Sequence, residues 1–258
     1  MYASLPMYDW PEVRGEVDRL WQRTALHLRT AGLDVPDRLD RQGDIQKGWQ
    51  RADLLLSQTC GLPYVRHLRG RVALVGAVDH GLSGIAPGMY CSRIVVRRGE
   101  VAGLAAFRGR RVAFSETDSQ SGAGALRHLV RPLLRDGRFF GETLATGAHA
   151  ASIRAVAQGR ADLAAIDAAS WELALRHMPE AQDLAVIAST DPTPGLPLIT
   201  RLGGPVVALQ QALAAALAET PAADRQAMML QAILPRQDAD FDILALWDAQ
   251  SAGYAEIS

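Results

Sequence analysis

Apolar and polar positions in the first eighty residues predict a strand, a long helix and two further strands. Residues 2–7 are apolar in alternation, and Pro11 stands where a helix can begin. Apolar residues then recur at helical spacing up to Gly32, a residue that favours a helix end. The three consecutive leucines within residues 53–57 indicate a strand buried on both faces, as in a parallel sheet. The valine-rich run 72–78 is the next predicted strand.

The middle of the chain repeats a strand followed by a helix. Strands are predicted over residues 94–96, 111–114, 139–145, 161–166, 184–188 and 196–200. Helices are predicted over residues 119–134, 150–158 and 169–177. This alternation indicates a parallel sheet covered by helices. After residue 205 the pattern has only helical periods, over residues 206–219, 222–233 and 241–251, and we expect these helices to pack back onto the first sheet.

The charges of the chain nearly cancel, with 27 Lys and Arg against 28 Asp and Glu among 258 residues. This balance removes the broad attraction on which a nucleic-acid or anionic-membrane binder depends, so we expect no nucleic-acid partner. The longest apolar stretch, residues 206–218, is interrupted by two glutamines and is shorter than the roughly 18 residues of a membrane span. Cys60 and Cys91 have no metal-ligand spacing, so no metal or cofactor is predicted.

The sequence carries no recognisable catalytic motif. It contains no GxSxG elbow, no HExxH and no GxGxxG after a predicted strand, and Lys47 lies outside any P-loop pattern. Cys60 with His149 is one conceivable pair of thiolate and base. The stronger interpretation of Cys60 is a small, half-buried side chain beside the turn glycine Gly61. The sequence therefore predicts a protein that binds its ligand without catalysis.

Hydroxyl groups cluster where one predicted strand meets the next helix. Residues 115–122 read Ser-Glu-Thr-Asp-Ser-Gln-Ser-Gly and follow the strand predicted at 111–114. Free backbone N–H groups and the dipole at a helix start favour an anion. The alternative is that Asp118 or Ser119 only caps the helix. Because residues 114–125 contain no Arg or Lys, backbone N–H groups would have to neutralise a bound anion.

Three other segments follow predicted strands: residues 8–10, 58–61 and 146–149. Open α/β sheets bind ligands at the carboxyl ends of their strands, so these segments are candidates for the same site. His149 either donates to the anion or caps a helix, and Tyr8 either lines the site or packs against the first helix. Asp167, at the end of another strand, either binds a cationic substituent of the ligand or is a further cap.

Five motifs spread along the chain form a set. They are ASLPMYD at residues 3–9, DLLLSQTCGLP at 53–63, YCSRIVV at 90–96, a strand leading to Ser-x-Ser-Gly at 104–122, and Gly-x-His followed by a strand ending in Asp at 146–167. This set resembles the phosphate/phosphonate substrate-binding family of ABC transporters over about residues 3–200.

The resemblance implies a type II periplasmic-binding-protein fold, with two α/β lobes that are joined by two crossover strands. In that fold each lobe is a mostly parallel sheet flanked by helices. Ser119, Ser121 and His149 match positions that hold the phosphate or phosphonate group, and Tyr8 matches an aromatic residue of the cleft. Gln120 stands where many members have Thr or Ser, so an amide replaces one hydroxyl donor. This departure points to a ligand other than a phosphonate. The expected ligand-binding residues are Tyr8, Gln58, Thr59, Tyr90, Ser92, Ser119, Gln120, Ser121, His149 and Asp167.

We expect lobe 1 to comprise residues 1–85 and 188–258, and lobe 2, with the anion site, residues 86–187. The predicted function is capture of a small anionic ligand, phosphate-like or phosphonate-like, in the cleft between the lobes for an ABC-type uptake system. The alternatives are an intracellular small-molecule enzyme and a ligand sensor on the same fold.

The resemblance also implies a periplasmic location, a transporter permease as partner and a monomer. Residues 1–15 lack the basic start and apolar stretch of a signal peptide, which instead favours the cytoplasm if the sequence is complete.

Overall fold

The computed structural model describes residues 1–100 and 102–251. Its chain forms two compact units, each with its own sheet. Unit 1 combines Met1–Gly88 with Pro194–Asp242, and unit 2 combines the described residues of Met89–Thr193 with Ile243–Ser251. Two short strands where the chain passes between the units, β4 (Met89–Tyr90) and β10 (Thr193–Pro194), pair with each other.

The sheet of unit 1 has the order β1-β2-β11-β3-β12. Its strands are β1 (Tyr2–Ala3), β2 (Leu54–Gln58), β3 (Val72–Asp79), β11 (Pro197–Arg201) and β12 (Ala232–Leu234). β1 and β2 are parallel, whereas β11 is antiparallel to both β2 and β3. The strands β1, β2 and β3 therefore run in the same direction, and their carboxyl ends share one edge of the sheet.

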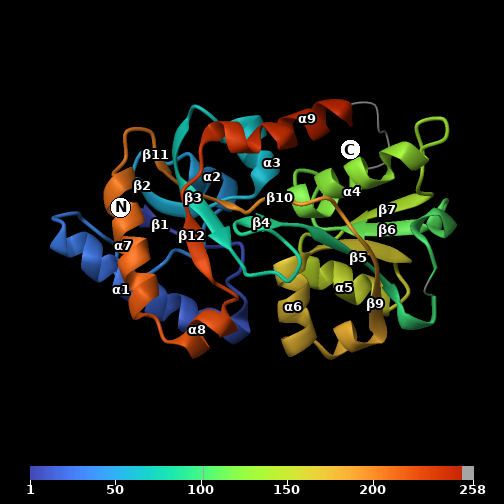
Figure 1. The fold of residues 1–258 in the computed structure, drawn as a ribbon, viewed down its shortest axis with the longest axis horizontal. Coiled ribbons are helices and arrows are strands. Elements are labelled where there is room, and N and C mark those ends of the chain that lie inside the picture. Colours follow the sequence, from blue (N-terminus) through green and yellow to red (C-terminus); the bar gives the residue numbers. More distant parts are fainter. Residues whose placement is uncertain (101, 252–258) are drawn as a thin grey trace. The chain divides into compact units, whose positions relative to one another are not determined.

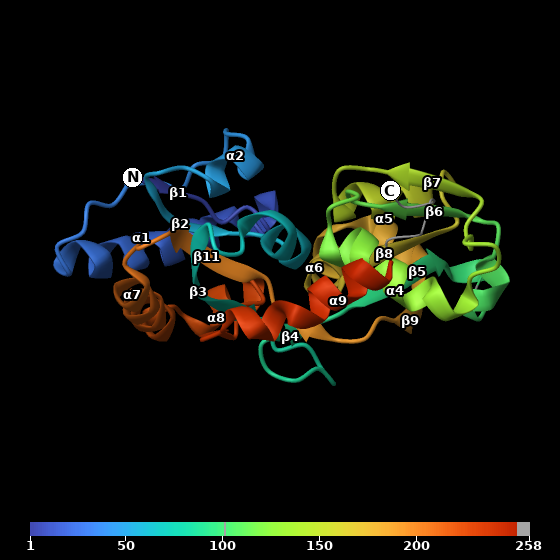
Figure 2. The same cartoon turned by 90° about the horizontal axis from the view of Figure 1, so that it is seen from above.

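Two long helices, α1 (Arg14–Thr30) and α7 (Val206–Glu219), lie side by side over the sheet of unit 1 (Figures 1 and 2). The core of the unit fills the space between them and the strands, with Trp21, Leu28 and Leu213 among its buried side chains. The remaining helical segments of the unit are η1 (Pro11–Val13), α2 (Ile45–Trp49), α3 (Gly61–Pro63), η2 (Tyr64–Leu68), α8 (Ala222–Ala227) and η8 (Asp238–Phe241).

The helix predicted at residues 222–233 is wrong in its second half. α8 ends at Ala227, and Met229 adopts a positive φ of 52°, so the chain turns there. The following residues form β12, in which Ile233 pairs with Val78 of β3. Pairing with the sheet edge overrides the helical propensity of this Leu- and Ala-containing segment.

The sheet of unit 2 has the order β7-β6-β8-β5-β9. Its strands are β5 (Ser92–Arg97), β6 (Arg111–Phe114), β7 (Glu142–Ala145), β8 (Leu163–Asp167) and β9 (Leu184–Ser189). β6 is parallel to β7 and β8, and β5 is antiparallel to β8. The carboxyl ends of β6, β7 and β8 therefore lie at one edge, where β5 begins.

Helices cover both faces of this second sheet, with α4 (Ala125–Val130) on one side and α5 (His149–Ala157) and α6 (Ala168–His177) on the other (Figure 1). The other helical segments are η3 (Arg98–Glu100), η4 (Leu104–Phe107), η5 (Gln120–Gly124), η6 (Arg131–Leu133), η7 (Pro179–Asp183) and α9 (Asp242–Gln250). The helix predicted at 119–134 is thus three consecutive segments: a π-helical turn, an α-helix and a 3-10 turn. The predicted strand 139–145 is confined to Glu142–Ala145.

The predicted division into lobes stays a prediction, and the two units differ from it mainly in α9. Residues 188–258 were expected in lobe 1, yet α9 packs within unit 2 from Ile243 onward. The indole of Trp247 stacks on the ring of His128 in α4, with ring centroids 3.8 Å apart and planes inclined by 8°. Within the described residues, no helix is long and apolar enough to cross a membrane.

Candidate ligand-binding site

One edge of the unit 2 sheet gathers five of the expected site residues. Ser119 and Ser121 follow β6, His149 follows β7, and Asp167 ends β8. Ser92 begins β5 and is the cross-strand partner of Asp167. Because the three parallel strands end at this edge, segments that are far apart in sequence meet there, as the rule for ligand sites in α/β sheets requires.

The π-helical turn η5 carries the two serines. Ser119 caps it, since its Oγ accepts a hydrogen bond of 3.0 Å from the backbone N–H of Gly122. A Cβ at Gly122 would lie 2.5 Å from Ser115 Oγ and 3.1 Å from Ser119 Oγ, so only glycine fits without displacing a neighbour. The first turn of a helix leaves its N–H groups without intrahelical acceptors, and π-helical turns recur at functional sites.

His149 meets this turn from the start of α5. Its Nε2 lies 2.9 Å from Ser121 Oγ. The residue is half-buried, and its Nδ1 is enclosed. Burial lowers the pKa of the imidazole below its usual 6.5, although Asp167 and the carbonyl group of Ala165 act in the opposite direction. The imidazole is therefore neutral at pH 7, and it shares a hydrogen bond with a serine hydroxyl.

Two further hydrogen bonds fix the position of the turn. Ser92 Oγ donates to the backbone carbonyl of Ser121 at 2.8 Å, and the backbone N–H of Ser92 donates to Thr190 Oγ1 at 2.9 Å. Asp167 caps α6 by accepting from the backbone N–H of Ser170 at 2.8 Å. Ser92, Thr190 and Asp167 are all buried, so these bonds hold the site without competition from solvent.

Two residues beside the turn, Ser115 and Arg127, were not among the expected ligand-binding residues. Ser115 Oγ is enclosed and makes no hydrogen bond within the described residues. Arg127 is buried in α4, with Nη1 3.5 Å from the carbonyl oxygen of Thr117 and Nη2 4.0 Å from Asp248 Oδ1. Residues 114–125 contain no cation, but Arg127 reaches back toward them. The only indication of this role in the sequence was the position of Arg127 within the helix predicted at residues 119–134.

The other expected residues have varied surroundings. Gln120 is buried as the first residue of η5, and Tyr90 is buried in β4. In unit 1, Thr59 is buried, and its backbone N–H donates to the carbonyl of Pro197 at 2.9 Å. Tyr8 and Gln58 line an apolar cavity of the same unit.

Comparison with known proteins identifies the family. The family model described as "ABC transporter, phosphonate, periplasmic substrate-binding protein" matches residues 49–241, about three quarters of the chain. The chain belongs to this family. No curated protein matches the chain.

Solved structures with the same fold include binding proteins for phosphonates. PhnD1 from Prochlorococcus marinus (MIT 9301), in complex with methylphosphonate, aligns with a TM-score of 0.75 and 15% identity over 98% of each chain. XAC2383 from Xanthomonas citri, bound to ATP, aligns with a TM-score of 0.72 and 16% identity over 99% of each chain. A binding protein component of an ABC phosphonate transporter from Pseudomonas aeruginosa aligns with a TM-score of 0.68 and 16% identity, covering 99% of this chain and 89% of its own. At these identities the likeness establishes the fold alone.

Membership of the phosphonate substrate-binding family confirms three of the sequence-based predictions. The fold is the predicted two-sheet α/β fold of periplasmic binding proteins. The expectation of mostly parallel sheets is wrong, because β11 and β12 run antiparallel to β3 in unit 1 and β5 runs antiparallel to β8 and β9 in unit 2, so both sheets are mixed. The function is binding of a small ligand for an ABC transporter. The family consists of substrate-binding proteins, so the alternative of an enzyme is not supported.

Proposed function

We propose that this protein captures a small oxyanion, of the phosphonate or phosphate type, at the edge of the unit 2 sheet and delivers it as a monomer to an ABC-transporter permease. The observation that carries the proposal is the hydrogen bond between Ser121 and His149, at a helix start that requires Gly122. It joins two segments of the family motif into one set of polar groups.

The chemistry of these groups suits an oxyanion. Serine hydroxyls, a neutral imidazole and the N–H groups of a helix start are all able to donate hydrogen bonds. Glu116, the carboxylate nearest to Ser115 in sequence, is exposed. Arg127 adds positive charge behind the turn, so the anion need not be neutralised by backbone dipoles alone.

Asp167 limits which oxyanions are favoured. Its buried carboxylate lies at the same edge of the sheet as the serines, and a dianion there meets like charge. A monoanion, or an oxyanion that carries a proton or a cationic substituent, avoids this repulsion. We therefore expect phosphonates in the monoanionic form to bind more tightly than dianionic phosphate.

The proposal is tested by isothermal titration of the full chain with phosphate, methylphosphonate and 2-aminoethylphosphonate. The double variant Ser119→Ala/Ser121→Ala loses two hydrogen bonds to a charged group, each worth about 1.5–3 kcal/mol, so affinity should fall by roughly a hundredfold or more. The matched control is Ser83→Ala/Ser189→Ala, which changes two exposed serines. Equal affinity in both double variants would show that the anion is held elsewhere.

A further inference from the structure

A buried arginine lies directly behind the π-helical turn η5 of the anion site. Arg127 is 5% exposed and belongs to α4, which continues from η5 without a break. A charged side chain is rarely buried unless a partner compensates for the loss of its hydration. The groups around Arg127 therefore determine how much of its positive charge acts on the turn.

The guanidinium group of Arg127 contacts two segments that are far apart in the sequence. Its Nη1 lies 3.5 Å from the carbonyl oxygen of Thr117, in the loop that leads from β6 to η5. Its Nη2 lies 4.0 Å from Oδ1 of Asp248 in α9, whose side chain is 26% exposed. One rigid, planar group thus faces the loop of the anion site with one nitrogen and a carboxylate of α9 with another.

Packing, rather than this ion pair, holds Asp248 in place. Its neighbour Trp247 is 5% exposed and stacks on His128, the residue next to Arg127, with ring centroids 3.8 Å apart. Leu244 of the same helix is also buried. These contacts fix α9 on α4 within unit 2, so an amide in place of the Asp248 carboxylate would leave the helix where it is.

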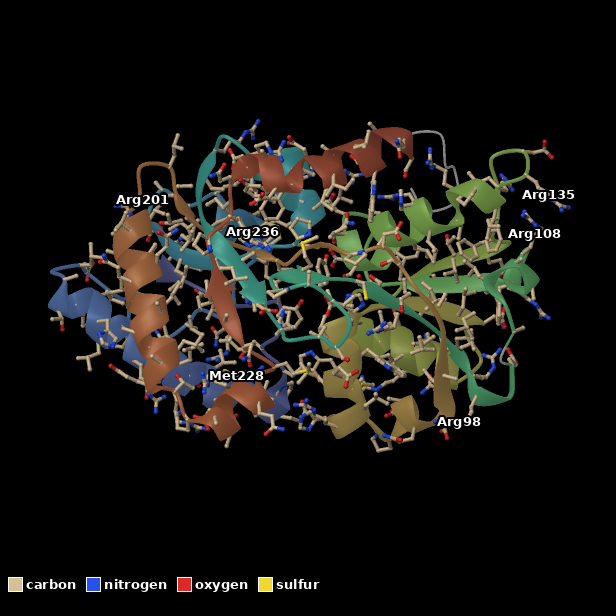
Figure 3. All side chains as sticks on the ribbon, viewed as in Figure 1. Arg98, Arg108, Arg135, Arg201, Met228 and Arg236 are labelled. Atoms are coloured by element: carbon tan, nitrogen blue, oxygen red, sulfur yellow. The ribbon has the colours of Figure 1, made fainter. Side chains whose placement is uncertain are left out.

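Other arginines of unit 2 lie at the opposite end of its sheet. Arg98 follows the end of β5 and Arg108 precedes β6, whereas the anion site lies where β5 begins and β6 ends. Figure 3 shows both side chains, with that of Arg135, at this outer end of the unit. A strand of the length of β5 spans about 17 Å, roughly twice the screening length at physiological ionic strength. Of these four arginines, Arg127 is the one whose charge reaches the turn.

The charges of Arg127 and Asp248 are close enough to the turn to act on a bound anion. Thr117 precedes Ser119 by two residues, so the Arg127 guanidinium lies within about 10 Å of the Ser119 backbone. At this separation, in partly buried surroundings, one unit charge changes the affinity for an anion several-fold. The carboxylate of Asp248 acts with the opposite sign from slightly farther away, and it therefore offsets part of the attraction that Arg127 exerts.

We propose that Asp248 determines the charge selectivity of the anion site: its carboxylate offsets the positive charge of Arg127 and thereby disfavours dianions relative to monoanions. This role rests on the proposed function, and it places a selectivity residue outside the ligand-binding segments. Because electrostatic energy is proportional to the charge of the ligand, the carboxylate destabilises a bound dianion by twice the free energy that applies to a monoanion. The factor in affinity for a dianion is therefore the square of the factor for a monoanion.

The test is isothermal titration of methylphosphonate against Asp248→Asn and the unmodified chain. Methylphosphonate carries mainly one negative charge at about pH 6.5 and two at about pH 9. His128 and His149 remain mostly neutral at both values, because burial lowers their pKa values below 6.5. Asp248→Asn should raise the affinity about threefold at the lower pH and about tenfold at the higher pH. An equal factor at both pH values, or a loss of affinity, would give Asp248 a purely structural role and overturn the inference.

The matched control is Asp183→Asn. Asp183 is exposed and directly precedes β9, at the end of the sheet away from the anion site, so its substitution removes the same charge without facing Arg127. The affinity of this variant should equal that of the unmodified chain at both pH values. If Asp183→Asn reproduced the effect of Asp248→Asn, the net charge of the protein would be the cause and the role of Asp248 would be refuted.

The other member of the pair is tested by Arg127→Met. This change should lower the affinity, by a larger factor at about pH 9 than at about pH 6.5, because an attractive charge is removed. The double variant Arg127→Met/Asp248→Asn removes both charges, so its ratio of affinities at the two pH values should return close to that of the unmodified chain. The ratio of Arg127→Met alone in the double variant would show that the Asp248 carboxylate does not act on the anion.

Failure of this inference and failure of the proposed function give different results. If the unmodified chain bound no methylphosphonate at either pH, the proposed function would be contradicted and this inference with it. If the unmodified chain bound methylphosphonate and Asp248→Asn left the ratio of the two affinities unchanged, only the role of Asp248 would be contradicted.

Discussion

Substitution of a single methyl group for a hydrogen atom at Gly122 should damage both stability and ligand binding. In Gly122→Ala the new Cβ would lie 2.5 Å from Ser115 Oγ, 3.0 Å from the backbone nitrogen of Ser115 and 3.1 Å from Ser119 Oγ. The Ser115 side chain can rotate away, but its backbone nitrogen cannot. The turn must therefore shift away from β6, which weakens the hydrogen bond from the Gly122 N–H to Ser119 Oγ.

The magnitude follows from these contacts. Overpacking of a fitted site costs about 1–3 kcal/mol, and loss of a helix cap costs about 1 kcal/mol. For a protein of this size each kcal/mol lowers the Tm by about 2–4 °C, so a decrease of roughly 4–16 °C is expected. Affinity for methylphosphonate should fall at least tenfold, because one charge-assisted hydrogen bond is misplaced.

The assay is thermal unfolding and isothermal titration of Gly122→Ala beside the control Gly99→Ala. Gly99 lies in the same unit, has no atom within 4 Å of an added Cβ, and has no positive φ. Its substitution should leave Tm and affinity close to those of the unmodified chain. Equal Tm values and equal affinities in the two variants would show that this turn does not require glycine.

Two more predictions concern the half-buried histidines His149 and His128. Because burial lowers the pKa of His149, the unfolded chain binds a proton below pH 6.5 that the folded chain excludes. The free energy of unfolding should therefore fall on acidification by up to about 1.4 kcal/mol per pH unit. Urea titrations between pH 7.5 and 5.5 should show a smaller fall for His149→Gln than for the unmodified chain. Burial is also the main cause of the lowered pKa of His128, and the indole of Trp247 stacks on its ring. Trp247→Ala should therefore raise the pKa of His128 toward 6.5 in an NMR titration. Because Trp247 is buried, the same change should lower the free energy of unfolding by about 3–5 kcal/mol. An unchanged His128 titration would contradict the role given to the stacked indole.

The sequence predicted the elements whose hydrophobic period is strong. α7 spans Val206–Glu219, the range expected from its period, and β2 lies within one residue of the leucine run that indicated it. Prediction was weaker where tertiary pairing determines the structure. β12 exists because its backbone pairs with β3, and no local pattern in residues 232–234 distinguishes it from a helix.

The candidate anion site could be predicted from the sequence because strand ends and helix starts have fixed positions in an α/β sheet. The hydrogen bond between Ser121 and His149 follows from the adjacency of β6 and β7, which the alternation of strands and helices alone does not establish. The cavity of unit 1 was not predictable, since its lining residues range from Leu5 to Ile233. That Gln58 Nε2 lacks an acceptor within the described residues is a property of the packed structure and leaves no trace in the sequence.

The position of β11 has a consequence for synthesis on the ribosome. This strand lies between β2 and β3, yet it is made about 120 residues after β3 ends. At about 5–20 residues per second, the nascent chain spends roughly 6–24 s with β2 and β3 lacking the strand between them. The strands of unit 2 are contiguous in the chain, so that sheet can form first. Nascent-chain binding by chaperones should therefore concentrate on the amino-terminal 79 residues and end once residue 201 leaves the exit tunnel.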